Sequence, residues 1–279
     1  NAEARALLEK IDAGRSLSYY DARAAQLLDR ALLRDLPRGP AASGTPDARV
    51  SRALERWSLL RDIGWNESAS YELARLKRDV GSNIALLYTI AEQLIAKGHA
   101  NAGIHTGREL LEKGERFNHR LLRILYPLPY QDTIEREARR HGLDPFFVAA
   151  LMRQESWFNP QAVSGANAVG LMQVVPSTGR ALARGENVGN VTAETLKDPE
   201  INIRLGTKFL ADLMRTWQSR TDAVLAAYNA GPTRMERWRR FPEFAQPDLF
   251  VERIPFEETR DYVRVVRVNT TIYHALYGD

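Results

Sequence analysis

The sequence predicts an all-α protein in which β structure is at most minor. Through most of the 279 residues, apolar side chains recur at intervals of three and four, which is the spacing of one helix face. Glycine and proline stand where these periodic segments stop, as helix ends require. With 44% hydrophobic residues, the chain is long enough for one large domain or two ordinary ones, each with its own core.

The first 125 residues predict a helical array. Two apolar stripes, over residues 3–11 and 21–36, are followed by Gly14 and Pro37, and the glycine- and proline-rich residues 38–46 predict an exposed connection. Four more helices are predicted from Asp47 onwards. A unit of two helices in roughly 34 residues is the period of a helical solenoid, and a plain helical bundle is the alternative. The glycines that separate these helices are Gly64, Gly81, Gly98 and Gly114.

The chain divides at the segment Tyr126-Pro127-Leu128-Pro129-Tyr130. A helix cannot continue through two prolines, and a new helix is predicted from Gln131 towards Arg140. We therefore expect residues 1–125 to form a helical superhelix or linker domain, short for a complete superhelix, and residues 126–279 to form a second domain. The later helices are predicted over residues 145–158, 176–184, 199–217, 221–230 and 257–276, with an irregular segment at 187–195.

One carboxylate of the second part is a candidate general acid. The helix that carries it begins after Asp144, a good N-cap. Glu155 lies four and seven residues after Leu151 and Val148, so it shares their buried stripe, where a charge is costly unless it is paired or protonated. Asn159-Pro160 ends the helix, which leaves Glu155 in its last turn. This position suits an acid that faces a cleft.

Composition excludes several kinds of chemistry. The chain has no cysteine, and its five histidines show no metal-ligand spacing, so we expect no thiol catalysis, no metal site and no cofactor. No apolar run approaches the roughly 20 residues that span a bilayer, and no signal peptide is apparent at the start of this chain.

The basic residues are mostly arginine. The net charge is +4, and six of the 39 cationic side chains are lysine. Arginine prefers planar anionic partners, which makes an acidic polymer a plausible ligand, and a solvated basic surface is the alternative.

Four separated motifs in the second part resemble those of the soluble lytic transglycosylase family, over roughly residues 126–279. Residues 19–24 are similar, less specifically, to the α-superhelical region of that family. Asn167 stands where the family usually has glycine, and asparagine tolerates the left-handed conformation. Val175 replaces a frequent methionine. The motifs are Glu155-Ser156; Gly170-Leu171-Met172-Gln173 followed by Pro176-Ser177-Thr178; Ala227-Tyr228-Asn229-Ala230-Gly231-Pro232; and Pro255-Phe256-Glu257-Glu258-Thr259-Arg260 followed by Tyr262-Val263.

The resemblance implies a lysozyme-like, mostly helical catalytic domain that cleaves bacterial peptidoglycan. Such enzymes cut between N-acetylmuramic acid and N-acetylglucosamine and leave a 1,6-anhydromuramoyl end instead of adding water. Their single catalytic acid is here Glu155. The implied partner is a glycan strand, with no nucleic acid and no stable membrane span, and the implied compartment is the periplasm. The implied substrate-binding residues are Ser156, Ser164, Met172, Gln173, Tyr228, Asn229, Glu258 and Tyr262.

Several of these residues have an ordinary structural interpretation as well. The hydroxyl of Ser156 can orient the Glu155 carboxylate or only help to end the helix. Met172 alone would more often belong to a core, whereas Gln173 can both donate to and accept from a sugar. Tyr228 and Tyr262 lie in apolar stripes, where tyrosine is usually buried with a satisfied hydroxyl.

The number of carboxylates decides between two enzymes on this fold. Glycoside hydrolysis usually needs two carboxylates. The acids nearest in sequence to Glu155 are Asp144, which is predicted to cap the helix, and the loop residues Glu186 and Glu194. With one acid, the sugar itself must supply the nucleophile, which predicts the anhydro product. Glu258 as a second acid would instead give a lysozyme-type hydrolase. A helical protein that binds glycan or nucleic acid through arginine without turnover is the third alternative.

Overall fold

The computed structural model describes residues 2–12, 17–41 and 47–278. Over these ranges the regular structure is helical, which confirms the all-α prediction. The β structure described consists of two isolated antiparallel bridges, Val163 with Val169 and Val169 with Val174. No helix in the described ranges is long and apolar enough to cross a membrane.

The chain forms two compact units. One combines Asn1–Arg34 with Tyr130–Asp279, and the other is Asp35–Pro129. The sequence places the division at residues 125 and 126 and assigns all earlier residues to one domain. In the structure, the contacts of residues 1–34 group them with the second half of the chain instead.

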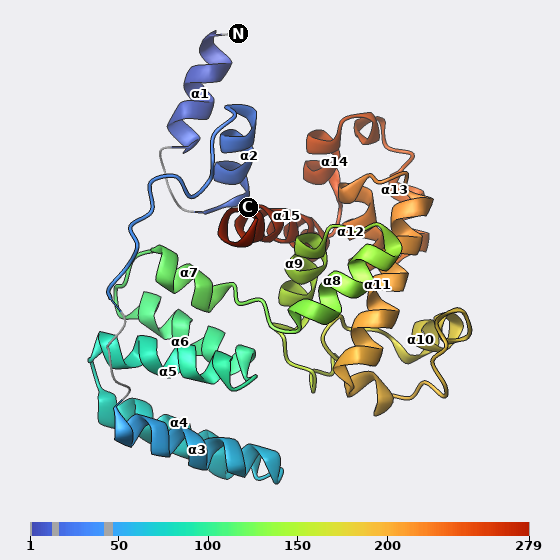
Figure 1. Ribbon diagram of the computed structural model, residues 1–279. Helices are drawn as coiled ribbons and strands as arrows, with labels where there is room; N and C mark the ends of the chain where they lie inside the picture. Colours follow the sequence, from blue (N-terminus) through green and yellow to red (C-terminus); the bar gives the residue numbers. More distant parts are fainter. Residues whose placement is uncertain (1, 13–16, 42–46, 279) are drawn as a thin grey trace. The chain divides into compact units, whose positions relative to one another are not determined.

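The Asp35–Pro129 unit is built from paired helices. Helix α3 pairs with α4 and α5 pairs with α6, while α7 packs against α6 (Figure 1). Trp57, Leu54 and Leu94 belong to one apolar cluster, and Leu87 and Leu121 belong to a second. The helix bounds are α3 (Ala48–Asp62), α4 (Asn66–Val80), α5 (Ile84–Ala96), α6 (Ala100–Glu112) and α7 (His119–Leu125).

The larger unit is centred on α9 and α15. Helix α15 packs against α9 and α12, and α11 packs against α8 (Figure 1). The buried residues of α9 are apolar, and Val148, Leu151 and, on α15, Val263 are fully buried. The helix bounds are α1 (Ala2–Asp12), α2 (Tyr19–Leu27), α8 (Gln131–His141), α9 (Pro145–Ser156), α10 (Pro176–Ala183), α11 (Pro199–Thr216), α12 (Thr221–Ala230), α13 (Pro232–Trp238), α14 (Pro247–Arg253) and α15 (Glu257–Tyr277).

Helix α2 joins this unit through polar contacts with α14 and α15. Arg23 donates from Nη2 to Oδ2 of Asp248 at 2.7 Å, and Arg267 donates from Nη1 to the Tyr19 hydroxyl at 2.9 Å. Helix α2 is shorter than the predicted 21–36 stripe because the chain turns after Leu27, with Asp29 at a φ of 54°.

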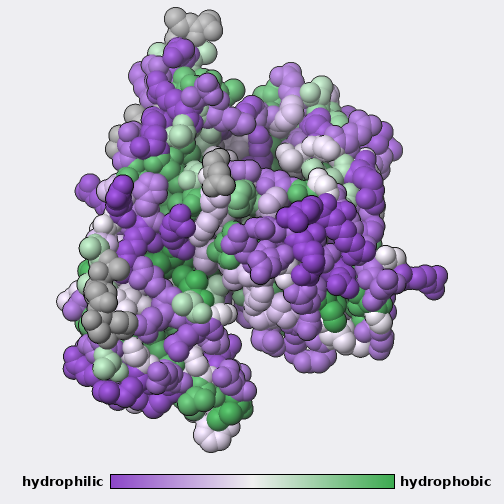
Figure 2. Space-filling model, viewed as in Figure 1, coloured by the Kyte–Doolittle hydropathy of each residue, from purple (hydrophilic) through white to green (hydrophobic). Residues whose placement is uncertain are grey.

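The outward face of α8 is strongly hydrophilic. Its exposed residues include Arg136, Arg139 and Arg140, and Figure 2 shows a hydrophilic patch over this helix. The opposite face buries Ile134 and Ala138. The alternation of these two faces is the helical period that the sequence shows.

Candidate active site

Glu155 lies in the last turn of α9, as the sequence predicts. The helix begins after Asp144, whose Oδ1 accepts from the backbone N–H of Phe146 at 2.9 Å. Val148 and Leu151 on the same stripe are fully buried, whereas Glu155 keeps part of its surface exposed. The carboxyl group therefore stands at the edge of an apolar core and can still be reached from outside.

Burial raises the pKa of Glu155 to about 7. The hydrogen bond from Tyr262 opposes this rise because it stabilises the carboxylate, and the negative charge of Glu258 adds to it. Near neutral pH the carboxyl group is divided between its two protonation states. A group with such a pKa can both donate and accept a proton at that pH.

Two tyrosine hydroxyls belong to this site. The Tyr262 hydroxyl, from α15, donates to Oε1 of Glu155 at 2.5 Å. The Tyr228 hydroxyl, from α12, donates to the backbone carbonyl of Met172 at 2.7 Å. Burial first, and then the charge of Glu155, hold the pKa of each tyrosine well above its ordinary value. Both hydroxyls therefore remain protonated donors.

The turn after α9 approaches α11 closely at Gly170. Gly170 has a φ of 80°, and a Cβ atom there would lie 2.3 Å from Nδ2 of Asn202 and 2.4 Å from the Leu196 carbonyl oxygen. Only glycine fits both this conformation and this contact. The motif glycine therefore has a structural reason in this chain.

Asn202 is a site-supporting residue that the sequence does not indicate. Its buried amide donates from Nδ2 to the carbonyls of Val169 at 2.8 Å and Leu196 at 2.7 Å. Its Oδ1 accepts from the backbone N–H of Met172 at 2.8 Å. One side chain thus fixes three backbone groups of the turn.

Ser156 and Gln173 of the first two motifs, and Ser164 between them, bind the backbone of this turn. The Ser156 hydroxyl donates to the Leu171 carbonyl at 2.8 Å, so it ties the end of α9 to the turn. The Ser164 hydroxyl accepts from the Ala168 N–H at 3.1 Å. Gln173, at a φ of 49°, donates from Nε2 to the Gly170 carbonyl at 2.9 Å. These contacts shape the loop.

The other predicted site residues have different environments. Met172 has no exposed surface and packs against Gly206 and Thr207, so its side chain belongs to the core, and its backbone groups bind Tyr228 and Asn202. Glu258 is exposed at the start of α15 and acts on Glu155 through its charge.

Asn229 connects two helices of the site. Its Oδ1 accepts from the buried Thr259 hydroxyl at 2.7 Å, which joins the end of α12 to the first turn of α15. Tyr228 and Tyr262 lie on these same two helices, so this bond helps to fix their relative position.

The chain resembles known lytic transglycosylases in sequence. Residues 132–250 match the family described as "Transglycosylase SLT domain". The soluble lytic murein transglycosylase of Escherichia coli K12 is 29% identical over 289 residues, which cover 100% of this chain and 42% of that protein. A membrane-bound lytic murein transglycosylase C from Edwardsiella ictaluri is 40% identical over 112 residues, 37% of this chain and 31% of that protein.

Solved structures agree with the sequence comparison. The 70-kDa soluble lytic transglycosylase of Escherichia coli has a TM-score of 0.82 at 27% identity, over 100% of this chain and 44% of that one. An inactive mutant of the lytic transglycosylase Slt from Pseudomonas aeruginosa has a TM-score of 0.76 at 27% identity, over 98% of this chain and 43% of that one. This chain thus spans about two fifths of the length of the relatives it matches.

The matched residues 132–250 include Glu155, the Gly170 turn and Tyr228, and the structural match extends over the whole chain, including Tyr262. The motifs, the fold and the sequence comparison all indicate similarity to lytic transglycosylases. Residues 132–250 therefore match the Transglycosylase SLT domain, and the chain is similar over its full length to soluble lytic murein transglycosylases.

Proposed function

We propose that this protein is a peptidoglycan lytic transglycosylase in which Glu155 acts first as acid and then as base. The observation that carries this proposal is the Glu155 carboxyl group, with a pKa raised to about 7 and a hydrogen bond from Tyr262. A catalytic group works best in both roles when its pKa lies near the operating pH.

In the first step, protonated Glu155 gives its proton to the oxygen between N-acetylmuramic acid and N-acetylglucosamine. The raised pKa keeps a substantial fraction of the carboxyl groups protonated near neutral pH. As the bond breaks, the acetamido oxygen of the muramic acid supports the positive charge at C1, so the protein need not supply a nucleophile.

In the second step, the Glu155 carboxylate takes the proton of the sugar's own 6-hydroxyl as that oxygen closes on C1. Tyr262 stabilises this carboxylate between the two steps, because its hydroxyl donates to Oε1. Closure within one sugar has the advantage of proximity over attack by water. The product is a 1,6-anhydromuramoyl end.

The glycan contacts that we propose use four predicted residues that are at least partly exposed, Ser164, Gln173, Asn229 and Glu258. Gln173 donates from its amide nitrogen to the carbonyls of Gly170 and Ala162 and retains its oxygen as an acceptor for a sugar hydroxyl. The relatives named murein transglycosylases, and a solved complex of the 70-kDa enzyme with bulgecin A, support peptidoglycan as the partner and the bacterial periplasm as the compartment.

Glu258 supports a second candidate, a lysozyme-type hydrolase. It is exposed, and its charge already acts on the Glu155 carboxyl group. If Glu258 held a water molecule, the same bond would break with addition of water and would leave a reducing end.

Digestion of purified peptidoglycan separates the candidates. We expect each new muramoyl end to be lighter by one water than a hydrolysed end, with no label after reaction in heavy-oxygen water. Incorporation of the label would assign the protein to the hydrolases. Salt-sensitive binding to sacculi with no product would support the third alternative, a protein that binds glycan through arginine without turnover.

Two neighbouring glutamates provide a matched test of the second candidate. Glu257 and Glu258 are both exposed in the first turn of α15. Under the transglycosylase proposal, Glu258→Gln changes the affinity for glycan but not the anhydro product, and Glu257→Gln controls for the loss of one charge. Two results together would support the hydrolase. Turnover would be lost in Glu258→Gln but not in Glu257→Gln, and the product of the wild-type protein would carry the heavy-oxygen label.

A further inference from the structure

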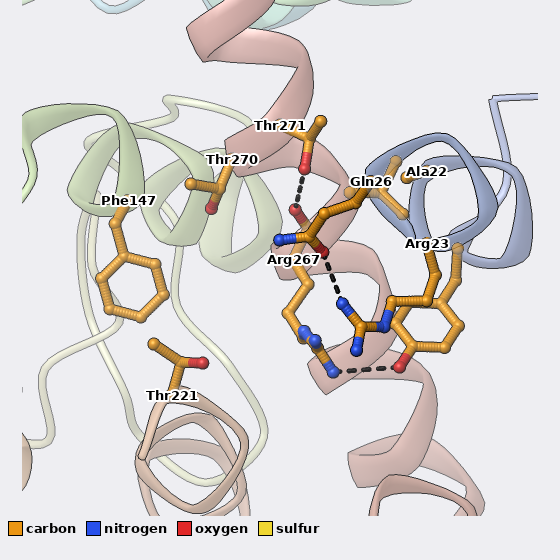
Figure 3. Close-up of a pocket in the computed structure, with 10 residues that line it drawn as sticks. Ala22, Arg23, Gln26, Phe147, Thr221, Arg267, Thr270 and Thr271 are labelled. Carbon is orange, nitrogen blue, oxygen red and sulfur yellow. Dashed lines mark hydrogen bonds between the residues drawn. The ribbon is translucent and has the colours of Figure 1, made fainter. Parts of the chain in front are cut away.

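A cavity of about 210 Å³ lies between α2, α15 and the first turns of α9 and α12 (Figure 3). It is separate from the active site, because its Phe147 precedes Glu155 by eight residues on α9, about 12 Å along the helix. Its lining residues on α2 are Tyr19, Ala22, Arg23 and Gln26, and those on α15 are Arg267, Val268, Thr270 and Thr271.

Arg267 offers free hydrogen-bond donors to this cavity. Its Nη1 donates to the Tyr19 hydroxyl at 2.9 Å, and its ion pair with Asp248 is longer, at 3.6 Å. A guanidinium carries five N–H donors. Within the described part of the chain, Arg267 uses only this one group towards protein acceptors, so most of its planar fork is available.

The amide nitrogen of Gln26 is a second donor. Arg23 gives two hydrogen bonds to Oδ2 of Asp248 and a third, from Nη1, to Oε1 of Gln26 at 2.7 Å. This last bond fixes the orientation of the Gln26 amide, because its oxygen must face Arg23. Figure 3 shows the nitrogen of Gln26 on the other side, towards the space bounded by Thr270 and Phe147.

The charges around the cavity leave an excess of positive charge. Two guanidiniums, Arg23 and Arg267, share the single carboxylate of Asp248. On α15, three and four residues after Arg267, Thr270 and Thr271 donate to carbonyls of their own helix, so their oxygens offer lone pairs. The ring of Phe147 completes the lining with an apolar surface.

We propose that this cavity binds a small carboxylate, with Arg267 and Gln26 as the residues that hold the carboxylate oxygens. A guanidinium fork matches the planar carboxylate in geometry as well as in charge. The volume is below the roughly 300–1,000 Å³ typical of pockets for drug-sized ligands, so the occupant is about the size of one acylated amino acid. Its amide N–H would meet the threonine oxygens, and its side chain would meet Phe147.

Such a ligand would hold α2 against α15, because its carboxylate contacts a donor on each helix. A ligand that binds only the folded arrangement stabilises it by mass action. This proposal is independent of the chemistry assigned to Glu155, which lies at the other end of α9.

Calorimetric titration of the complete chain with N-acetylalanine tests the proposal. N-acetylalaninamide, which lacks only the carboxylate, is the matched probe, and propionate has the carboxylate without the acylamino group. We expect saturable binding of N-acetylalanine and none of the amide. Equal binding of propionate would assign the site to simple carboxylic acids, whereas stronger binding of N-acetylalanine would assign it to amino acids or peptide ends.

The variant Gln26→Glu makes the test specific. It keeps an oxygen for Arg23 and replaces the facing donor with a negatively charged oxygen at an exposed position, so the fold should persist. We expect binding to weaken by at least about tenfold, as for the loss of a charge-assisted hydrogen bond. Arg267→Gln should do the same, and Gln161→Glu, at an exposed position away from the cavity, should have no effect. Three results would overturn the proposal. They are no binding of N-acetylalanine, equal binding of N-acetylalaninamide, and binding that is unchanged in both Gln26→Glu and Arg267→Gln.

Discussion

The Tyr262 hydroxyl and Oε1 of Glu155 are 2.5 Å apart, and they join residues 107 positions apart in the chain. The hydrogen bond works against the larger effect of burial, which raises the pKa of the carboxyl group. In the proposed mechanism, burial favours the protonated acid of the first step, and Tyr262 favours the carboxylate of the second step. Under that proposal, the pair sets the balance between the two protonation states.

Replacing Tyr262 by phenylalanine should slow turnover and change its pH dependence. Without the donor, the pKa of Glu155 rises above about 7, because the remaining influences, burial and the charge of Glu258, both raise it. The base step then needs a higher pH, and the pH optimum moves up. At pH 7 we expect a loss of about tenfold in kcat, the effect of one hydrogen bond to a charged group.

The pH profile of kcat measures this effect, with Tyr277→Phe at the far end of α15 as the control. A merely structural role for Tyr262 would lower the activity of Tyr262→Phe equally at all pH values. Such a uniform loss would contradict the proposed balance.

Glu155→Gln should abolish turnover and stabilise the fold above neutral pH. The folded pKa of about 7 exceeds the ordinary value of 4.5. Between these values the unfolded chain ionises while the folded protein keeps its proton, so wild-type stability falls as pH rises. Glu155→Gln cannot ionise at this position, so its stability does not fall in this way. Above pH 7 it should be more stable by on the order of 3 kcal/mol, and below about pH 4 the two should be equal.

Thermal melts of both proteins across this pH range, beside activity assays, check the prediction. Retention of even a few per cent of turnover by Glu155→Gln would move the acid elsewhere, with Glu258 as the first alternative. Equal melting temperatures of the two proteins at all pH values would show that folding does not raise the pKa of Glu155.

Gly170→Ala should destabilise the protein and inactivate it. The new methyl group would meet Asn202 and the Leu196 carbonyl at under 2.5 Å, in a backbone conformation that alanine rarely adopts. We expect a loss of about 3 kcal/mol in the free energy of unfolding. Gly165→Ala in the same loop is the control, because nothing lies within 4 Å of its added Cβ. Denaturant unfolding of the two variants should differ clearly, and equal stability would show that the turn can move.

The sequence predicts those features of the fold that depend on local pattern. Helix α15 was predicted over residues 257–276 and spans Glu257–Tyr277, because its apolar stripe is uninterrupted and Pro255 precedes it. Likewise, Glu155 was placed in the last turn of its helix from the spacing to Leu151 and from the proline that follows. Both signals lie within a few residues of the feature they predict.

The remaining features depend on contacts between distant residues. Asn202 holds carbonyls 33 and 6 residues away in the chain, and no spacing rule relates an asparagine to backbone groups. The bond between Arg23 and Asp248 spans 225 residues, which is why α2 was assigned to the first domain. For Ser156 the sequence leaves two roles open, orienting the Glu155 carboxylate or helping to end the helix, and only the folded turn brings the Leu171 carbonyl to its hydroxyl.

The contacts of α2 lead to a prediction about a protein that consists of residues 130–279. It keeps every residue proposed for the chemistry, so it should still cut short soluble glycans, and we expect its larger loss on intact sacculi if the earlier helices hold long strands. It also lacks the partners of Asp248 and Arg267 on α2, so it should melt at a lower temperature than the 279-residue chain.

Arg23→Ala in the 279-residue chain separates the effect on stability from the effect on glycan binding, because it should lower the melting temperature and leave activity on sacculi nearly unchanged. Activity on sacculi that falls in Arg23→Ala as far as in the shortened protein would show that residues 1–129 support the catalytic unit and do not hold the glycan.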